Sequence, residues 1–372
     1  MASAATAASG TAQSTPGASS GSGGQNPFQI ATNLYAEKNN QGLITSQILG
    51  AAQIPGGGSI NAGNYLRGVR LIVRTVTPGV AGTVTPDAPW NIFAQLDLIN
   101  VDGSEILYNM PGYSYYLSQK YFRPWLQSPD TAYDGAASTA LSPQFTLFLQ
   151  PEVRWTAGVL ANTDTRSQYR WDQTLNTAAA VGTGYTTAPT ISVTPYMDAW
   201  AQPDAQDLQG TANQPVPPGV NLQTKRRHQI FSMNAAGSNN IYLSTLTGNA
   251  LRGMILVSRD STGARVQSIS DPLYWQLDNR SLGRLNPDII RQWKEDFYAS
   301  YSRGPLETGV AVFPRFLDPG DLDGQGWLYT SNATKLQWET ATAAGVTGIG
   351  TMELIADEVY PVGPVDPQLV DL

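Results

Sequence analysis

The sequence predicts an all-β protein in which one sandwich-like domain is built twice. Residues 64–77 and 249–262 share seven of fourteen positions in register, and self-similarity at so long a spacing is typical of a duplicated domain. Short segments rich in β-branched and aromatic residues follow each stretch, and Gly- and Pro-rich turns separate them. This number and spacing of strands favour a sandwich or jelly roll over βαβ units.

Further matches extend the repeat in the same order along the chain. They are residues 93–97 with 274–278, 169–172 with 336–339, and 190–198 with 351–359. The offset between the copies falls from 185 to 181, 167 and 161. We therefore expect shorter loops in the second copy.

The first copy is expected to contain strands joined by tight turns. These strands lie at 66–76, 90–101, 104–108, 145–150, 154–159, 168–174 and 190–197. Asp102-Gly103 is a hairpin turn signal between two of them. Pro111-Gly112 ends this hairpin, and the aromatic stretch 113–122 that follows predicts a short helix.

The second copy is expected to repeat this pattern. Its strands begin near Ile230 and continue at 241–246, 251–259, 273–277, 310–316, 327–330, 335–340 and 352–359. A helix over 286–301 interrupts them, because Asn286 suits an N-cap and Pro287 suits the first helical position. Its apolar residues, which recur every four positions and should face the sandwich, are Ile289, Trp293, Phe297 and Tyr301.

Composition divides the chain into four parts. Residues 1–26 are mostly Ala, Ser, Thr and Gly without a charge or an aromatic ring, so this arm alone is expected to be disordered. We assign the first jelly roll to 27–205, a Pro-rich linker to 206–224, and the second jelly roll with a C-terminal tail to 225–372.

Charged residues are few, at 14% of the chain against roughly 25% in typical soluble domains. Two interpretations stay open: other subunits cover much of the surface, or the surface is a β surface rich in Thr, Ser, Asn and Gln. The net charge is −7, and the only basic cluster is Lys225-Arg226-Arg227, which we expect in a solvated loop. Nothing resembles the basic stripe of a nucleic-acid-binding protein, so sequence-specific binding is not expected.

The chain offers little for catalysis or metal binding. His228 is the only histidine, and the basic residues before it disfavour the imidazolium of a Ser-His-Asp system, so we expect a solvated or hydrogen-bonded surface residue. With one His and no Cys, transition-metal sites are not expected. Asp318, Asp321 and Asp323 alternate like calcium ligands, but the EF-hand spacing is absent, so a turn is favoured. We assign no catalytic, cofactor-binding or metal-binding residues.

Other local signals are equally weak. The Gly-rich stretch 55–59 follows no strand-to-helix pattern and lacks a Lys, so it is not a phosphate loop. No secretory signal is predicted, and no apolar run approaches the roughly 18 residues of a membrane span. The aromatic residues are scattered over many strands, so we expect them to fill cores and subunit contacts rather than a sugar-binding face.

The order and spacing of several stretches, over roughly residues 60–360, resemble one known family. These stretches are 66–73, 99–103 with Asn109 and Gly112, 157–162, 167–170, and Asn286-Pro-Asp with its helix. They look like the double jelly-roll major capsid proteins of membrane-containing icosahedral phages, the tectivirus group in particular. The resemblance implies two eight-stranded jelly rolls in tandem, with a short helix in each half.

The resemblance also implies a structural virion protein without catalytic activity or a cofactor. Its homotrimers would present a pseudo-hexagonal outline, tile an icosahedral shell, and assemble in the host cytoplasm. Its partners would be other copies and neighbouring capsomers, while minor capsid or vertex proteins and an internal viral membrane stay open. The arm at 1–26 and the tail at 361–367 are then hypothetical clasps between neighbours.

Two other function classes stay open at this point. A carbohydrate- or receptor-binding β-sandwich protein, such as a phage spike or a lectin, would bind glycans as an isolated protein. An enzyme on a jelly-roll scaffold, such as a glycosidase, would need two facing carboxylates and an acid with a raised pKa.

Overall fold

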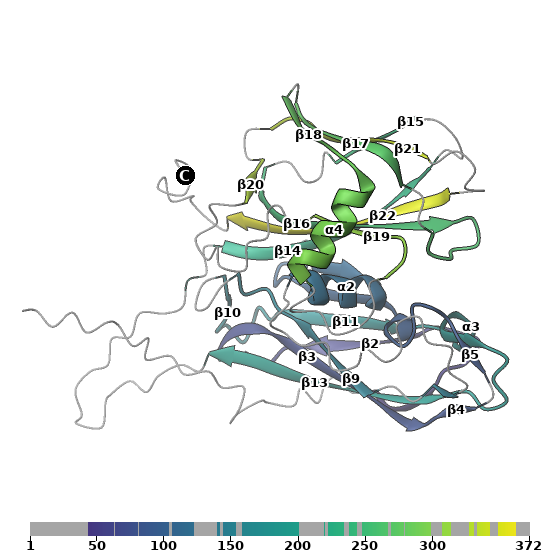
Figure 1. Ribbon diagram of the computed structural model, residues 1–372. Coiled ribbons are helices and arrows are strands. Elements are labelled where there is room, and N and C mark those ends of the chain that lie inside the picture. Colours follow the sequence, from purple (N-terminus) through teal and green to yellow (C-terminus); the bar gives the residue numbers. More distant parts are fainter. Residues whose placement is uncertain are drawn as a thin grey trace, which may run out of the picture.

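Two β sandwiches lie one above the other in the computed structural model (Figure 1). The structure describes residues 44–122, 140–200, 219, 222–313 and 327–361, without 63, 81, 104–105, 142–143, 154–157, 234–237, 244–247, 267–268, 279, 299–306, 331–332 and 343–348. The predicted arm at 1–26 and the acidic turn at 318–323 lie outside the described residues. So does the C-terminal tail beyond Pro361.

The first sandwich has two layers. Its strands are β1 (Ile44–Ile48), β2 (Ile54–Ser59), β3 (Asn64–Thr77), β6 (Phe93–Ile99), β7 (Ile106–Met110), β9 (Gln144–Leu149), β10 (Leu160–Asn162), β11 (Arg170–Leu175) and β13 (Thr190–Trp200). One layer has the order β1-β13-β3, with β9 and β10 both pairing with β3, and the other has the order β2-β11-β6-β7. At one end lie the short pairs β4 (Gly79–Val80) with β8 (Ala140–Leu141) and β5 (Thr83–Val84) with β12 (Gly182–Thr183). The 3₁₀ helix Trp90–Ile92 and helix α3 (Ala178–Val181) contact each other beside them.

The second sandwich repeats this plan. Its strands are β14 (Leu222–Ser232), β15 (Ser238–Tyr242), β16 (Ala250–Asp260), β17 (Ile269–Leu277), β18 (Arg280–Leu285), β19 (Val310–Phe313), β20 (Leu328–Tyr329), β21 (Leu336–Thr342) and β22 (Ile349–Pro361). One layer has the order β14-β22-β16, with β19 and β20 pairing with β16, and the other has the order β15-β21-β17-β18.

The two sandwiches correspond strand by strand. The layer β1-β13-β3 matches β14-β22-β16, and the layer β2-β11-β6-β7 matches β15-β21-β17-β18. Helix α2 (Gly112–Phe122) follows the hairpin β6–β7, just as helix α4 (Pro287–Tyr298) follows the hairpin β17–β18. The predicted repeat is therefore confirmed at the level of whole elements, and its two strongest stretches fall on β3 and β16.

Residue by residue, the predicted alignment is only partly correct. Trp171 on β11 lies opposite Leu98, whereas Trp338 on β21 lies opposite Trp275. If the two tryptophans match, Leu98 corresponds to Trp275. The predicted match of residues 93–97 with 274–278 does not pair Leu98 with Trp275. This match and the match of 169–172 with 336–339 therefore cannot both be correct.

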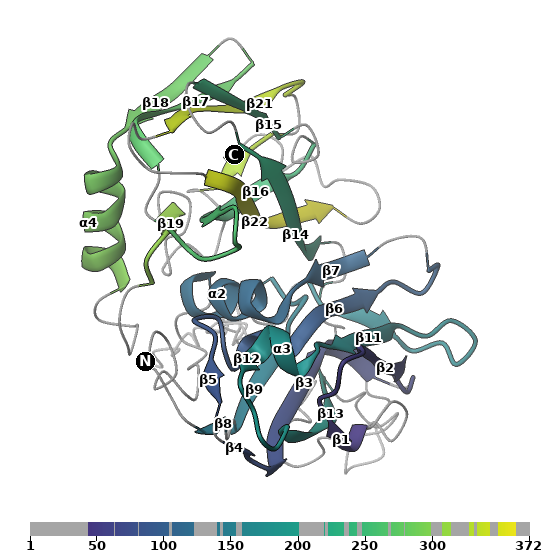
Figure 2. The same cartoon turned by 90° about the vertical axis from the view of Figure 1, so that its right-hand side faces the viewer.

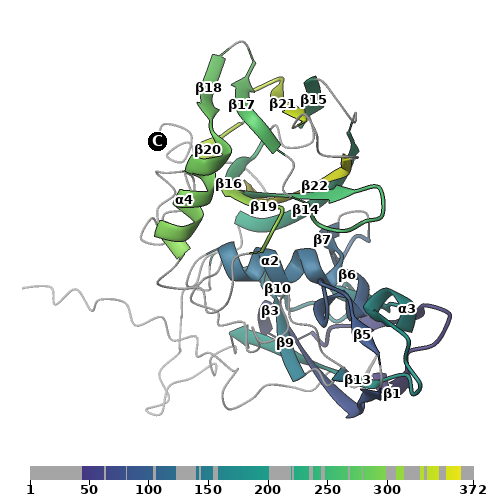
Figure 3. The same ribbon diagram turned by 45° about the vertical axis from the view of Figure 1, so that its right-hand side comes forward.

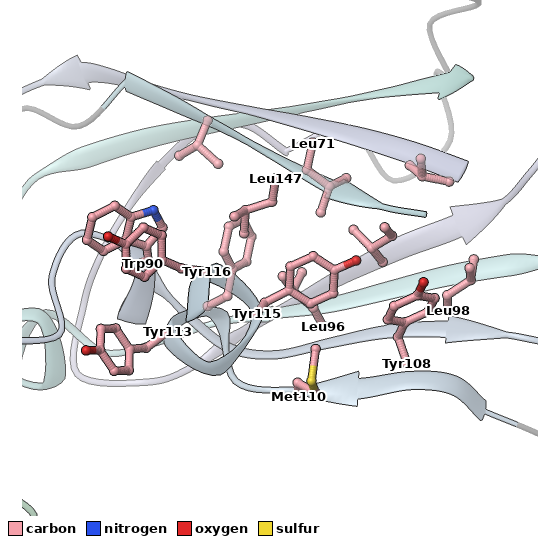
Figure 4. Packing of buried hydrophobic residues seen from close by; sticks show 14 of the residues in the cluster. Leu71, Trp90, Leu96, Leu98, Tyr108, Met110, Tyr113, Tyr115, Tyr116 and Leu147 are labelled. Carbon is pink, nitrogen blue, oxygen red and sulfur yellow. The ribbon is translucent and has the colours of Figure 1, made fainter. Parts of the chain in front are cut away.

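The core of the first sandwich is rich in aromatic rings (Figure 4). Trp90 and Tyr116 stack with ring centroids 3.6 Å apart. Every residue of α2 is buried, including the polar Ser118 and Lys120. One sheet can cover only one side of a helix, so the other side of α2 must be covered by a second structural element. Strands β6 and β9 pack on α2 from the first sandwich, and β16 and β22 pack on it from the second.

A smaller aromatic core fills the second sandwich. The ring of Trp338 lies 4.7 Å from that of Trp275 and 4.5 Å from that of Phe313, between centroids. These tryptophans are at most 3% exposed. Their burial agrees with the prediction that the aromatic residues fill cores rather than a sugar-binding face.

Several strand predictions need correction. Strands β1, β2 and β18 were not predicted, and Gly158 and Val159 lie just before β10 instead of within a strand at 154–159. Strand β14 begins at Leu222 rather than near Ile230. Its first residues, 222–224, were assigned to the linker, and the next three were expected in a loop, but in the folded chain Arg226 and Arg227 face buried carboxylates.

Helix α4 begins as predicted, but Ile289 does not face the sandwich. Asn286 Oδ1 accepts a hydrogen bond from the Asp288 backbone N–H at 2.7 Å. Ile289 is 46% exposed, whereas Ile290 and Lys294 are 2% and 3% exposed, so the prediction that Ile289 faces the sandwich is wrong. The side chains of the other three residues of the predicted face lie outside the described set. No helix in the described part of the chain is long and apolar enough to span a membrane.

Candidate functional site: the join between the two sandwiches

A parallel strand pair joins the two sandwiches. In β7 and β14, Tyr108 lies opposite Arg226 and Asn109 lies opposite Arg227. This pair connects two layers into a nine-stranded sheet that runs from β19 to β2 (Figures 2 and 3). Every other strand pair among the described residues is antiparallel, so the join is a distinct local structure.

Arg226 occupies the centre of the join and is 2% exposed. Its guanidinium carbon lies 5.2 Å and 5.7 Å from the ring centroids of Tyr108 and Tyr115 of the first sandwich. Its Nε donates a hydrogen bond to Asp357 Oδ1 at 3.4 Å. Burial alone would lower the pKa of Arg226, but Tyr108 and the Asp357 carboxylate raise it above the ordinary value. A guanidinium between two rings and a carboxylate stays charged and holds the sandwiches together.

A β-bulge at an arginine occurs once in each sandwich. On β3, Gly68 lies opposite Asp198 and Leu66 lies opposite Ala199, so Arg67 is an extra residue in its strand. Such a β-bulge bends the strand and redirects the extra side chain. We call the bulge at Arg67 the first Arg bulge.

The same bulge recurs on β16. Gly253 lies opposite Asp357 and Leu251 lies opposite Glu358, so Arg252 is the extra residue. We call this the second Arg bulge. The two bulges place Asp198 of β13 and Asp357 of β22 at equivalent positions, which are 159 residues apart (357 − 198). The predicted match of 190–198 with 351–359 assumed an offset of 161, so it needs correction.

Arg67 binds two carboxylates. Its Nε and Nη2 donate to Glu152 Oε2 at 2.9 Å and 2.7 Å, and its Nη1 donates to Asp198 Oδ1 at 3.4 Å. Arg70 also donates to Asp198, at 3.0 Å from Nη2. Burial raises the pKa of Asp198, although the charges of Arg67 and Arg70 oppose this shift.

Arg252 binds one carboxylate and two neutral groups. Its Nε and Nη2 donate to the two oxygens of Asp357 at 2.8 Å and 3.0 Å. Its Nη1 donates to the Val153 carbonyl at 3.2 Å, and its Nη2 donates to Thr224 Oγ1 at 3.1 Å. Asp357 therefore serves both Arg252 and Arg226.

The segment from Gln150 to Val153 connects the two Arg bulges. Glu152 binds Arg67, and the next residue along the chain offers its carbonyl to Arg252. The Thr224 backbone N–H donates to the Pro151 carbonyl at 3.1 Å. A movement of one sandwich against the other would break the contacts of both Arg252 and Thr224 with this segment.

A buried carboxylate links the two helices. Lys120 Nζ and the Tyr121 hydroxyl of α2 donate to the side chain of Glu307. Lys294 Nζ of α4 donates to the carbonyls of Glu307 and Val310 at 3.1 Å each. Burial alone would raise the pKa of Glu307, but the charges of Lys120 and Lys294 outweigh it and hold this pKa below its ordinary value.

A further ionic cluster lies at the same join. Asp87 of the first sandwich accepts from Arg259 Nη1 at 2.7 Å and lies 2.9 Å from Arg265 Nε. Glu353 accepts from Arg259 Nε at 2.6 Å and lies 3.3 Å from His228 Nε2. Burial would raise the pKa of Glu353, yet the hydrogen bond of His228 and the charge of Arg259 lower it below the ordinary value.

The structure corrects the expectation for the basic cluster and places the lone histidine. Lys225-Arg226-Arg227 does not form a solvated loop but lies within β14, where Arg226 faces Asp357 and Arg227 Nε lies 2.8 Å from Glu358 Oε1. His228 is half-buried beside Glu353, in agreement with a hydrogen-bonded residue. Sequence reasoning missed the buried arginines, although the Leu-Arg-Gly sequence shared by both copies was a signal for them.

Of the other candidate sites that the sequence offered, only the Gly-rich stretch lies within the described residues. The Gly-rich stretch 55–59 lies in the strand β2, which pairs with β11. In the described part of the chain, no group of three or more His, Cys, Asp or Glu side chains is arranged to hold a metal ion. The geometry gathered at the join fixes one sandwich against the other.

Solved structures of low sequence identity share the fold of this chain, whereas no protein-family model and no curated protein matches the sequence. The STIV MCP matches with a TM-score of 0.64 at 14% identity, over 92% of this chain and 100% of that chain. A chain of the PBCV-1 virus capsid matches with a TM-score of 0.57 at 11% identity, over 89% and 94%. The major capsid protein P2 from bacteriophage PM2 matches with a TM-score of 0.50 at 11% identity, over 87% and 97%.

The fold is the double jelly roll. Each match spans both sandwiches, so the predicted fold class is confirmed for the whole described chain. The similar double jelly rolls are capsid proteins, and the alternative of a carbohydrate- or receptor-binding protein gains no support from them.

Proposed function

We propose that this chain is a major capsid protein whose homotrimers form pseudo-hexagonal capsomers of an icosahedral virus shell. The observation that carries the proposal is the join, where a shared sheet and the ion pairs of Lys120 with Glu307 and of Asp87 with Arg259 hold two like jelly rolls as one body. Three such chains supply six similar jelly rolls, and closed cyclic symmetry is the usual arrangement of homo-oligomers. The STIV MCP and the PBCV-1 capsid chain are themselves capsid proteins, which supports the proposal.

The buried charges of the join suit this role. Removing one partner of a buried ion pair leaves an uncompensated charge and costs about 3–5 kcal/mol, so intermediate orientations of the two jelly rolls are unfavourable. A tile in a closed shell needs one fixed outline. The join supports a building block better than it supports a hinge.

The finer features belong to the same proposal. We propose a location in the virion, a structural role without catalysis or cofactor, and contacts with other copies and neighbouring capsomers. We also propose the division into an arm at 1–26, jelly rolls at 27–205 and 225–372, and a linker at 206–224. Because β14 begins at Leu222, we expect the linker to end slightly earlier.

Light scattering with electron microscopy of the purified full-length protein tests the proposal. We expect a particle of three times the mass of one chain with a six-lobed outline. A protein that stays monomeric at the concentrations used for assembly would contradict the proposal. Glycan binding by such a monomer would support the receptor-binding alternative instead.

The N-terminal arm provides a separate test. If residues 1–26 act as a clasp between capsomers, a chain that lacks them should still form trimers but assemble into shells poorly. Particle yield by sedimentation measures this effect. Normal particles from the truncated chain would remove the clasp from the proposal.

A further inference from the structure

The guanidinium of Arg226 is buried but poor in hydrogen bonds. Its Nε donates to Asp357 Oδ1 over a long distance of 3.4 Å, and its Nη2 has no hydrogen-bond partner among the described residues. A guanidinium carries five N–H donors, and a buried donor without an acceptor is unfavourable. The described residues therefore leave at least the Nη2 donors of Arg226 unsatisfied.

The surroundings of Arg226 supply aromatic faces instead of acceptors. Its guanidinium carbon lies over the rings of Tyr108 and Tyr115, which lie next to each other in the core (Figure 4). The hydroxyls of these tyrosines donate to the carbonyls of Gln150 and Phe148. A ring face attracts a cation, but it does not replace a strong hydrogen-bond acceptor.

The charges around Arg226 are also out of balance. Asp357 accepts hydrogen bonds from both Arg226 and Arg252. The other acceptors of Arg252 are neutral, namely the Val153 carbonyl and the Thr224 hydroxyl. All three charged side chains are at most 7% exposed. Two positive charges thus share one negative charge, and a buried charge without a counter-ion is strongly unfavourable.

The neighbouring charges of β14 do not restore the balance. Side chains of a strand alternate between its two faces, so Lys225 and Arg227 lie on the face opposite to Arg226. On that face Arg227 Nε lies 2.8 Å from Glu358 Oε1, and Lys225 Nζ lies 5.5 Å from the ring centroid of Tyr360. Glu358 therefore balances Arg227 and not Arg226.

The first Arg bulge shows what a balanced site contains. There Arg67 and Arg70 bind two carboxylates, those of Glu152 and Asp198. Two positive charges meet two negative charges. The second Arg bulge has the same number of arginines but one carboxylate fewer.

We propose that the join binds one small monovalent anion, of which chloride is the simplest, at Nη2 of Arg226. The anion supplies the negative charge that the second Arg bulge lacks, and its single charge matches the excess of one. A hydrogen bond from a guanidinium to an anion is stronger than one to a neutral acceptor. The site lies within one chain, so the inference is independent of the proposed homotrimer.

Thermal unfolding of the full-length protein at constant ionic strength tests the site. Sodium gluconate, whose anion is too large for the site, is replaced stepwise by sodium chloride. We expect the Tm of the wild type to rise by about 2 °C once chloride exceeds its Kd about tenfold. In Arg226→Met this rise should disappear.

The matched control is Arg170→Met, which removes an arginine from an exposed ion pair with Asp172 and should keep the rise. A general effect of salt would raise the Tm of all three proteins alike. Such a result, or a wild type that does not respond to chloride, overturns the site.

Bromide provides a measurement that needs no variant. Crystals of the full-length protein soaked in sodium bromide should show an anomalous scattering peak beside Arg226 Nη2. Gln150 Oε1 is another buried atom without a hydrogen-bond partner in the described part of the chain, so an ordered water is the competing occupant. Density without an anomalous signal would identify that water, and it overturns the anion, as does the absence of any peak.

Discussion

The two Arg bulges share their backbone geometry but differ in the charges around them. In the first, Arg67 binds two carboxylates, those of Asp198 and Glu152. In the second, Arg252 shares the single carboxylate of Asp357 with Arg226. Duplication has therefore kept the bulge and its aspartate, while the rest of the coordination has diverged.

The difference follows from the position of each bulge. The first lies within one sandwich, where Arg70, whose side chain is 38% exposed, also offers charge to Asp198. The second lies at the join, where Arg226 arrives from β14 and draws on the same aspartate. We therefore expect Asp357, the only carboxylate among the described residues that the two buried arginines Arg226 and Arg252 bind, to contribute more to stability than Asp198, because Arg67 also binds Glu152.

The largest expected effect comes from removing the charge of each aspartate. Asp357→Asn should lower the free energy of unfolding by about 3–5 kcal/mol, because Arg252 and Arg226 both lose their counter-ion. Asp198→Asn should cost clearly less, since Arg67 keeps Glu152. Urea unfolding at neutral pH measures both. An equal or larger loss for Asp198→Asn would show that the two bulges do not differ as described.

A smaller effect is expected from the groups that differ between the bulges. Glu152→Gln removes a charge-assisted partner of Arg67 and should cost about 1.5–3 kcal/mol, whereas Thr224→Val removes a neutral partner of Arg252 and should cost about 0.5–1.5 kcal/mol. The same unfolding experiment measures them. A greater loss for Thr224→Val would mean that the hydroxyl, and not the carboxylate, dominates its site.

The dependence on pH should have opposite signs at two carboxylates. The pKa of Glu353 is lowered, so its contribution to stability is present above the unfolded pKa and is lost as the pH falls through the folded pKa. The pKa of Asp198 is raised, so its contribution is present below the unfolded pKa and is lost as the pH rises through the folded pKa.

The cost of Glu353→Gln should therefore shrink on going from neutral pH to about pH 4, while the cost of Asp198→Asn should grow. Unfolding curves of both variants and the wild type at the two pH values supply the measurement. Parallel changes in the two variants would contradict the assigned shifts.

The sequence predicted the repeated sandwiches because their strands carry local signals. Strands β3 and β16 are rich in β-branched residues and share Leu-Arg-Gly, and Asn286-Pro287 begins α4 as an N-cap and first turn do. These signals depend on neighbouring residues, so they are visible without a structure.

The strands and contacts that were missed depend on distant residues. The polar start of β14 is a strand only because Asp357 and Glu358, far along the chain, face it from β22. Strand β2 is rich in glycine because β11 approaches closely, and a Cβ at Gly57 would lie 2.5 Å from the Trp171 carbonyl. From local composition alone, the start of β14 resembles a linker, and β2 resembles a loop.

The parallel pair of β7 and β14 also bears on the order in which the protein folds. Synthesis proceeds from the N-terminus, and domains generally fold as they emerge. Strand β14 is the first strand of the second half to appear, and it meets a β7 edge that the finished first half already holds in place. Until β14 arrives, the β7 edge lacks its partner strand, and an exposed strand edge is a site where another chain can pair and aggregate.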